Sequence, residues 1–182
     1  NGDESGHVRI YQNNNGIWEQ IGDDIDGEAA ADRSGFSVSL SADGSVVAIG
    51  AIGNDGNRAM SGHVRLYQND NGTWQQIGDD IDGEAAYDYS GTSVSLSADG
   101  STIAIGADYN DGNGNSSGHV RIYQNNNSTW TQVGQDIDGE ATDDYSGSVS
   151  LSADGSVIAI GAGFNDGNGN NSGHVRIFKN SG

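Results

Sequence analysis

An acidic loop that recurs three times carries the residue types best suited to chemistry. Its first copy reads Asp24-Ile25-Asp26-Gly27-Glu28 and is followed by Asp32. Acidic side chains that alternate around a glycine turn can direct several oxygens onto one hard cation, and calcium takes such ligands. We therefore expect calcium ligands in all three copies: Asp24, Asp26, Glu28 and Asp32; Asp80, Asp82, Glu84 and Asp88; and Asp136, Asp138, Glu140 and Asp144.

A second loop, rich in asparagine, also has the spacing of a calcium ligand set. Its Asp-x-Asn-x-Asn pattern matches the first half of an EF-hand loop, although the closing glutamate is missing. The alternative for both kinds of loop is a solvated turn whose side chains bond the local backbone. The candidate ligands of this second loop are Asp111, Asn113 and Asn115 in one copy and Asp166, Asn168 and Asn170 in the next.

The four histidines, His7, His63, His119 and His174, share one repeated position within Ser-Gly-His-Val. Equivalent positions on successive units lie too far apart to share a metal ion, so we expect no histidine cluster. We interpret each Ser–His pair as polar side chains at a strand edge, because a Ser-His-Asp triad needs one distinct nucleophile and here every candidate is repeated. We expect no catalytic residue and predict that the chain is not an enzyme.

The elements that position these residues follow a repeat of about 56 residues. The repeats span residues 5–60, 61–116 and 117–171, with a partial copy at 172–182. Each contains two pairs of segments with alternating apolar and polar residues, separated by Asn-Gly or Asp-Gly turns, which is typical of antiparallel hairpins. Repeats of this length indicate a propeller, solenoid or array. We predict an all-β, β-propeller-like array of four-stranded antiparallel blades, three repeats plus an extra strand.

Apolar and basic residues at repeated positions have predictable partners in such an array. We expect Val38, Leu40, Val47 and Ile49 to pack against neighbouring blades. The three tryptophans, Trp18, Trp74 and Trp130, fit packing between blades, with a sugar-stacking platform as the alternative. The arginines Arg9, Arg65, Arg121 and Arg176 should pair with the acidic loops. One repeat is a residue shorter, and the residue missing between Asp144 and Val149 is expected in the turn before a strand, because a deletion within the strand would reverse its faces.

The charge of the chain limits its partners. Seven basic residues stand against 26 acidic residues among 182, a formal net charge of −19. Nucleic acid is an unfavourable partner because its phosphates need a basic surface. No cysteine is present, which excludes disulfides and thiol catalysis. No apolar run approaches the roughly 20 residues of a membrane helix, so membrane insertion is not expected. Because the sequence begins within a repeat, we expect it to be part of something longer or a subunit whose ends meet other subunits.

The order of motifs resembles the FG-GAP repeat. The matching residues are Ser34-Gly35-Phe36-Ser37-Val38, Gly50-Ala51, Gly62 to Tyr67, and Trp74. That family builds the seven-bladed propeller of integrin α subunits and many bacterial surface and secreted propellers, so the resemblance implies a propeller fold and an extracellular or cell-surface location. The family's calcium loop lies between the first two strands of a blade, where this chain has only Ala42-Asp43-Gly44-Ser45. The family's calcium site therefore does not carry over to that hairpin.

Three repeats and a fraction cannot close a propeller of about four to eight blades. We expect an extracellular structural or adhesive protein that associates with itself head to tail through its terminal strands, as a ring or a filament. The last strand, His174 to Lys179, would complete a blade with the next copy. The alternative is a calcium-dependent propeller that binds a ligand or a carbohydrate, in the manner of a lectin or adhesin.

Overall fold

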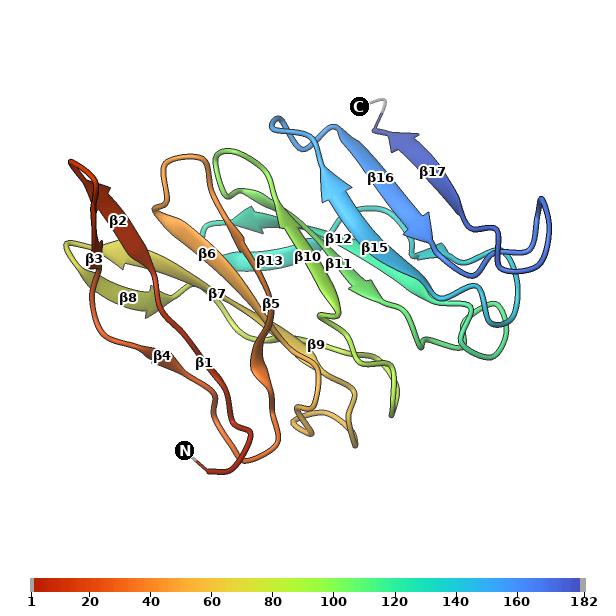
Figure 1. Cartoon of the computed structure of the whole chain (residues 1–182), viewed down its shortest axis with the longest axis horizontal. Helices are drawn as coiled ribbons and strands as arrows, with labels where there is room; N and C mark the ends of the chain where they lie inside the picture. Colours follow the sequence, from red (N-terminus) through yellow and green to blue (C-terminus); the bar gives the residue numbers. More distant parts are fainter. Residues whose placement is uncertain (1, 181–182) are drawn as a thin grey trace.

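The computed structural model describes residues 2–180 as a row of antiparallel β-sheets, whose two ends hold the two termini (Figure 1). Two complete sheets, blade 1 and blade 2, stand in the middle of the row. Blade 1 contains β5 (Ser34–Leu40), β6 (Val46–Ala51), β7 (His63–Asp70), β8 (Thr73–Gln76) and the short β9 (Ile81–Asp82). Blade 2 contains β10 (Ser93–Leu96), β11 (Thr102–Ala107), β12 (His119–Asn126), β13 (Thr129–Gln132) and the short β14 (Ile137–Asp138).

The sheets at the two ends of the row are incomplete. The N-terminal half-blade pairs β1 (His7–Val8) with β4 (Ile25–Asp26), and β2 (Tyr11–Asn14) with β3 (Ile17–Gln20). It has the third and fourth strands of a blade but not the first two. Within residues 2–180 the last blade is a three-stranded sheet of β15 (Ser146–Leu151), β16 (Val157–Ala162) and β17 (His174–Lys179). No helix within residues 2–180 could cross a membrane.

Each complete blade combines strands from two successive sequence repeats. In blade 1, β5 and β6 come from residues 5–60, while β7 and β8 come from residues 61–116. The all-β, four-stranded architecture is thus confirmed, but the expectation that both hairpins of one repeat form one blade is wrong. Neighbouring hairpins of a single repeat are separated by the long acidic loop, whereas the Asn-rich loop lets β6 pair with β7 along its whole length.

Short polar turns set the register of the inner hairpins. Asp43 Oδ1 accepts hydrogen bonds from the Ser45 amide (2.9 Å) and from the hydroxyls of Ser41 and Ser45 (both 2.7 Å). Gly44 follows with a φ of 72°, a left-handed conformation that glycine adopts without steric cost. The turn places Val38 opposite Ile49, and its equivalents place Val94 opposite Ile105 and Val149 opposite Ile160.

The shortened repeat loses its residue from a β-bulge. In β5, two residues lie between the paired positions Ser34 and Ser37, whereas in β15 only Gly147 lies between Ser146 and Ser148. The register beyond the bulge is the same in both strands. A bulge can lose a residue without turning the following side chains to the opposite face, so the deletion lies at the start of the strand rather than in a turn outside it.

Apolar residues from adjacent blades form the core. Between blades 1 and 2, residues of β6 and β7 such as Val46 and Leu66 pack against residues of β10 and β11 such as Leu96 and Ile103. Similar clusters join the half-blade to blade 1 and blade 2 to the last blade. Val47 and Ile49 are buried as predicted, but Val38 and Leu40 are about half exposed. Their expected burial is wrong because the half-blade lacks the inner strands that would cover β5.

Candidate functional site

The repeated acidic loop distributes its side chains over several partners instead of gathering them around one point. Asp24 lies between Arg9 and Gln20, with an Arg9 Nη2 to Asp24 Oδ2 distance of 2.8 Å. The hydrogen bond from Arg9 lowers the pKa of Asp24 to about 2. The backbone carbonyl of Asp26, by contrast, accepts a hydrogen bond from Arg65 Nη2 on blade 1 (2.9 Å). The Asp82 carbonyl binds Arg121 in the same way, at 2.6 Å, and the Asp138 carbonyl binds Arg176.

The last acid of each loop is buried and caps the backbone. Asp32, Asp88 and Asp144 accept hydrogen bonds from the amides of Ala29, Ala85 and Ala141, at 2.8, 2.9 and 3.0 Å. Asp88 and Asp144 also accept bonds from the side-chain amides of Asn110 and Asn165 (3.0 and 2.9 Å). These contacts hold the loops in shape, which is the behaviour expected of an acidic side chain in a tight turn.

The Asn-rich loops are held by backbone contacts as well. Asp111 Oδ1 accepts from the Ser116 amide (2.8 Å), and Asp166 Oδ1 accepts from the Asn171 amide (2.6 Å). The side-chain amide of Asn113 donates to the carbonyls of Gly139 and Glu140, and Asn115 donates weakly to Asp143 at 3.4 Å. The Asn168 backbone amide donates to Ser172 Oγ, and Asn170 is exposed. The acids described above already accept hydrogen bonds from the protein. Calcium binding by either loop stays a prediction.

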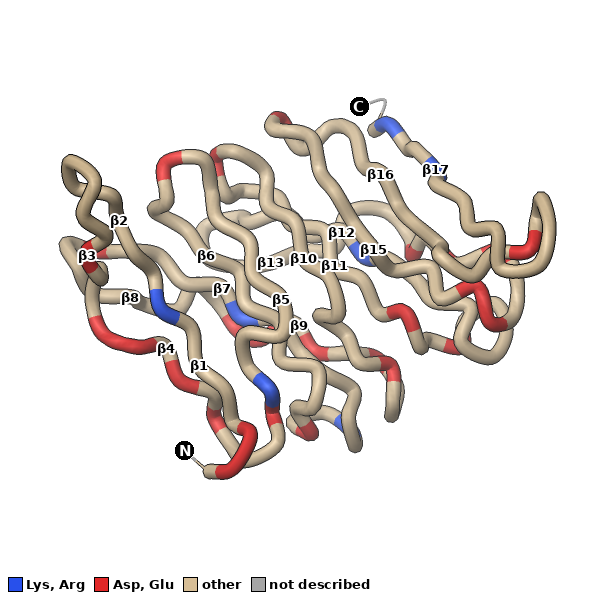
Figure 2. The backbone as a smooth tube through the Cα atoms, in the orientation of Figure 1, with Lys and Arg blue, Asp and Glu red and all other residues tan. Residues whose placement is uncertain are grey.

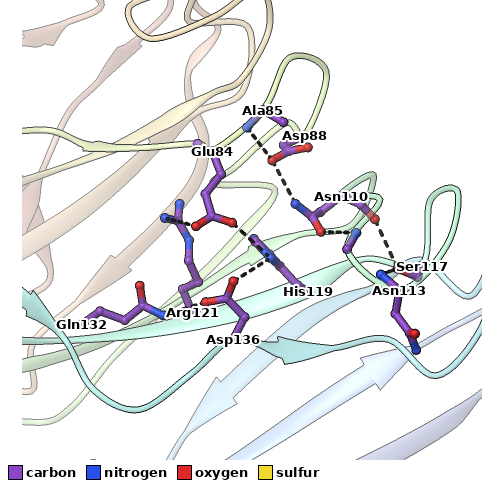
Figure 3. Close-up of polar contacts among 12 residues, drawn as sticks. Glu84, Ala85, Asp88, Asn110, Asn113, Ser117, His119, Arg121, Gln132 and Asp136 are labelled. Carbon is purple, nitrogen blue, oxygen red and sulfur yellow. Dashed lines mark hydrogen bonds and ion pairs between the residues drawn. The ribbon is translucent and has the colours of Figure 1, made fainter.

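The geometry brings together a different group, made of residues from two successive repeats (Figure 3). His119, at the start of β12, lies with its Nδ1 3.8 Å from Glu84 Oε2 and 3.7 Å from Asp136 Oδ2. Glu84 follows β9 of blade 1, whereas Asp136 precedes β14 of blade 2. The same group recurs one repeat earlier as Glu28, His63 and Asp80. In each group the three ligand-type atoms lie within 4.8 Å of one another.

The histidines in these groups are buried, contrary to the expectation of polar side chains at a strand edge. The exposed fractions of the His63 and His119 side chains are 1% and 2%. Burial lowers the pKa of both imidazoles, so both are neutral at neutral pH. The signal in the sequence was the common 56-residue period of the histidines and the acids. The group could not be recognised from this period, because the spacing of residues along the sequence does not show which residues of successive repeats lie in contact.

Three of the four predicted arginine pairs are confirmed. Arg9 pairs with Asp24, Arg65 Nη1 lies 3.3 Å from Glu28 Oε1, and Arg121 Nη1 lies 3.6 Å from Glu84 Oε1. Arg65 and Arg121 also lie over the rings of Tyr67 and Tyr123, at 5.6 Å from each ring centroid. Each of these two arginines therefore joins an acidic loop of one blade to the third strand of the next.

A row of aromatic rings crosses from blade 2 to the last blade. Tyr89, Tyr109, Tyr145 and Phe164 meet edge to face, with successive centroid distances of 5.1, 5.2 and 5.3 Å. Tyr109 and Phe164 are about half exposed. Tyr89 and Tyr145 have φ values of 53° and 50°, a left-handed conformation that is rare for bulky residues. The row was not foreseen, because its members occupy two different repeat positions.

The stacked four-stranded sheets define a propeller-type repeat protein, and solved structures agree with this. A protein assigned as a 6-phosphogluconolactonase from Bacteroides uniformis matches with a TM-score of 0.62 and 16% identity, covering 95% of this chain and 44% of that one. The periplasmic gluconolactonase of Pseudomonas aeruginosa matches with a TM-score of 0.57 and 17% identity, covering 94% and 45%. A complex of KlAtg21 with the coiled coil of AgAtg16 matches with a TM-score of 0.53 and 13% identity, covering 79% and 39%.

The sequence identifies the family more directly than these structures do. The FG-GAP repeat family matches residues 81–123 and 130–178, slightly more than half of the chain. The chain belongs to the FG-GAP repeat family. It spans less than half the length of the solved structures described above. Comparison with curated proteins gives no match.

One prediction from the sequence needs correction here. The repetition of every polar group led us to predict that the chain is not an enzyme. Two of the matching structures are named as lactonases, so a propeller of repeated blades is compatible with enzymatic activity, and the prediction is wrong. At 16% and 17% identity the likeness concerns the fold alone, and no activity follows from it for this chain.

Proposed function

We propose that this chain is an extracellular or cell-surface structural or adhesive protein that associates head to tail with further copies of itself. In this assembly, the last blade of one copy and the N-terminal half-blade of the next form one composite blade. The observation that carries the proposal is the different setting of equivalent tryptophans: Trp74 and Trp130 are docked on the preceding blade, whereas Trp18 is 65% exposed.

The interior joints define what docking means for this repeat. Trp74 Nε1 donates to the Ile21 carbonyl of the half-blade, and Trp130 Nε1 donates to the Ile77 carbonyl of blade 1, both at 2.9 Å. A glycine follows each carbonyl residue and lies directly against the incoming hairpin. A Cβ built on Gly78 would lie only 2.5 Å from the Ser128 carbonyl oxygen and 3.1 Å from Trp130 Cδ1. The joint is therefore shaped closely around one hairpin and one indole.

The same acceptor surface lies uncovered on blade 2. Val133 and Gly134 occupy the positions of Ile77 and Gly78, because the Val133 amide donates to the Ile122 carbonyl as the Ile77 amide donates to that of Leu66. A Cβ built on Gly134 would meet nothing within 4 Å. A cavity of about 480 Å³ lies here, lined by Val133, Gly134, Leu151, Phe178 and others. It is the place that the missing fourth strand of the last blade would fill.

The segment that matches this cavity is β3 of a second copy. It carries Trp18, and it pairs only with β2 in a two-stranded sheet whose residues are all exposed. An isolated two-stranded hairpin is only marginally stable, so exchanging its partner strand costs little. Two segments could occupy the third-strand position of the composite blade: β17 of one copy, or β1 and β2 of the next copy. The fourth-strand position can be filled only by β3 of the next copy. Exchange of identical elements between copies is an inexpensive route to association.

Exposed apolar residues support the same joint. Val175 and Ile177 on β17 are 64% and 71% exposed, although their equivalents Val64 and Leu66 are buried in blade 1. At the other end, Val38 and Leu40 on β5 lack the cover that Val94 and Leu96 have. Burial of one such side chain contributes roughly 1.5–3 kcal/mol, so covering several of them favours association.

The length of the matching structures supports a small assembly. Each of the two lactonases named above is a little more than twice as long as this chain. Two copies joined at both ends would therefore supply about one closed propeller, whereas a joint whose rotation does not close would yield a filament.

Sedimentation velocity over a range of concentrations tests the proposal, with electron microscopy to distinguish rings from filaments. We expect the chain to associate and Trp18→Ala to remain a monomer with an unchanged circular-dichroism spectrum. Tyr87→Ala is the matched control, because Tyr87 is an exposed aromatic residue in a loop of blade 1. Wild-type chain that stays monomeric at every concentration, or association that is as strong after loss of Trp18 as before, would contradict the proposal.

The aromatic row favours a second candidate, a calcium-dependent propeller that binds carbohydrate. Exposed tyrosine rings offer apolar faces to sugar rings and a hydroxyl to their polar groups. Left-handed backbone at Tyr89 and Tyr145 is a feature that concentrates at functional sites. A glycan array with and without a calcium chelator tests this candidate. Binding that is lost in Tyr109→Ala would support it, and an empty array in both conditions would refute it.

A further inference from the structure

The Glu84–His119–Asp136 group has the atoms and the spacing of a metal site. An ion bound at about 2.0–2.2 Å by tetrahedral ligands holds those ligands roughly 3.3–3.6 Å apart. The distances from His119 Nδ1 to the carboxylate oxygens are 3.7 and 3.8 Å, and the His63 Nδ1 to Asp80 Oδ2 distance is 3.4 Å. Because the ligand-type atoms of each group lie within 4.8 Å of one another, a shift of the half-exposed glutamate side chains would bring the donors to these values.

Each carboxylate in the group is anchored through one oxygen and turns the other toward the histidine (Figure 3). Gln132 Nε2 donates to Asp136 Oδ1 at 2.6 Å, leaving Oδ2 to face His119. Arg121 Nη1 lies beside Glu84 Oε1, leaving Oε2 to face the same nitrogen. The earlier group has the same arrangement, with Gln76 on Asp80 and Arg65 on Glu28. Such outer partners orient ligands in metal sites.

The histidine provides a second, independent indication of a ligand. His63 and His119 are almost completely buried, and their Nδ1 atoms face carboxylate oxygens, at 3.4 Å for His63 and at 3.7 and 3.8 Å for His119. These distances are longer than an ordinary N–H···O hydrogen bond. An imidazole can direct a lone pair from Nδ1 toward the two carboxylates. A cation between them would satisfy all three groups at once.

We propose that Glu28, His63 and Asp80, and likewise Glu84, His119 and Asp136, bind a divalent transition-metal cation of the zinc type at the joints between blades. One nitrogen and two carboxylate oxygens suit this class, with water completing the coordination. Calcium is a poorer match because it prefers six to eight oxygen ligands. The ion would link the acidic loop of one blade to the third strand of the next and stabilise the joint.

A third site follows if the copies join head to tail, and this extension rests on the proposed function. His174 Nε2 lies 3.2 Å from Glu140 Oε2 at the end of the row, but no acid within residues 2–180 takes the place that Asp80 and Asp136 occupy. In the composite blade, Asp24 of the next copy would take that place, because it holds the same repeat position. The assembled chain would then bind three ions per copy and the isolated chain two.

Zinc titration followed by calorimetry tests the inference, with Trp18→Ala as the monomeric background. We expect two ions per chain, one after Glu84→Gln, and none after Glu28→Gln is added. Gln132→Ala, which removes only an outer partner, should weaken one site about 10–100-fold. Glu19→Gln is the matched control, since it removes one exposed acid from β3 and should leave both sites intact.

The outcomes separate the two proposals. The metal-site proposal would be overturned if the number of zinc ions bound per chain did not change after the Glu28 and Glu84 substitutions. It would also be overturned if the unsubstituted sites bound no more zinc than the His63→Ala/His119→Ala variant does. These glutamate side chains are about half exposed, so their loss does not threaten folding, which circular dichroism checks. If both the monomeric Trp18→Ala variant and the associated wild-type chain bound two ions per chain, the two metal sites would be supported and only the composite blade would be contradicted.

Discussion

Loss of the Trp18 indole should weaken association strongly while leaving the single chain intact. If Trp18 becomes as buried as Trp74 and Trp130, about half of its side chain, on the order of 100 Å², leaves water. At about 25 cal/mol per Å² this contributes about 2.5 kcal/mol, and one indole hydrogen bond to the Val133 carbonyl adds about 1 kcal/mol. Because each 1.4 kcal/mol is tenfold, Trp18→Ala should raise the dissociation constant roughly 300-fold.

Sedimentation equilibrium measures this change directly, with thermal unfolding of the monomer as the parallel readout. Trp18→Phe keeps an aromatic ring but has no N–H donor, so its loss should be about tenfold or less. The melting temperature of the monomer should not change, because Trp18 lies on an exposed two-stranded hairpin and does not pack against another blade of its own chain. Equal dissociation constants for wild type and Trp18→Ala would refute the reasoning.

Three further predictions concern stability and salt. Trp130→Ala should destabilise the chain by about 3 kcal/mol in urea unfolding, since it empties an interior joint; a change as small as that of Trp18→Ala would show that Trp130 does not stabilise this joint. Hydrogen bonds from the turn serines lower the pKa values of Asp43 and Asp154 to about 2 and also lower that of Asp99, so their stabilisation is complete above about pH 4 and is lost as pH falls toward 2. The melting temperature should therefore fall in this window, and less steeply in Asp43→Asn/Asp99→Asn/Asp154→Asn; identical slopes would exclude these turns as the cause. Association should become stronger as the salt concentration is raised about tenfold, from 0.05 to 0.5 M, because salt screens the repulsion between copies that each carry a net charge of −19. Association that becomes weaker with salt would indicate that ion pairs hold the joint.

The acidic residues follow mainly the loops along one edge of the row of sheets (Figure 2). The exposed apolar side chains of Val175 and Ile177 at one end, and of Val38 and Leu40 at the other, lie on strands rather than in these loops. Repulsion between copies is therefore long-range and screened by salt, whereas the attraction at the joint requires contact.

The repeat, its hairpins and the packing of the interior tryptophans could be predicted from the sequence, because each depends on local alternation and turn residues. The grouping of strands into blades could not, since Ser37 to Ala51 can pair with the strand on either side of it. For the same reason the Glu–His–Asp groups were missed: Glu28 meets His63 only because blades stack. The exposure of Val38 could not be predicted, because the equivalent residue is buried in a blade that follows a complete blade, and the sequence does not show that only a half-blade precedes β5.

A disulfide between copies tests the composite blade most directly, and the absence of native cysteine makes the experiment clean. In the interior joints, Asp23 and Thr73 line one pocket, and Asp79 and Thr129 line the equivalent pocket, so Gln135 of one copy should lie near Ile17 of the next. Mixing Gln135→Cys with Ile17→Cys under mild oxidation should give a covalent dimer far faster than either variant alone or than Ile17→Cys mixed with Tyr87→Cys. Equal rates in all these mixtures would contradict head-to-tail joining through the fourth strand.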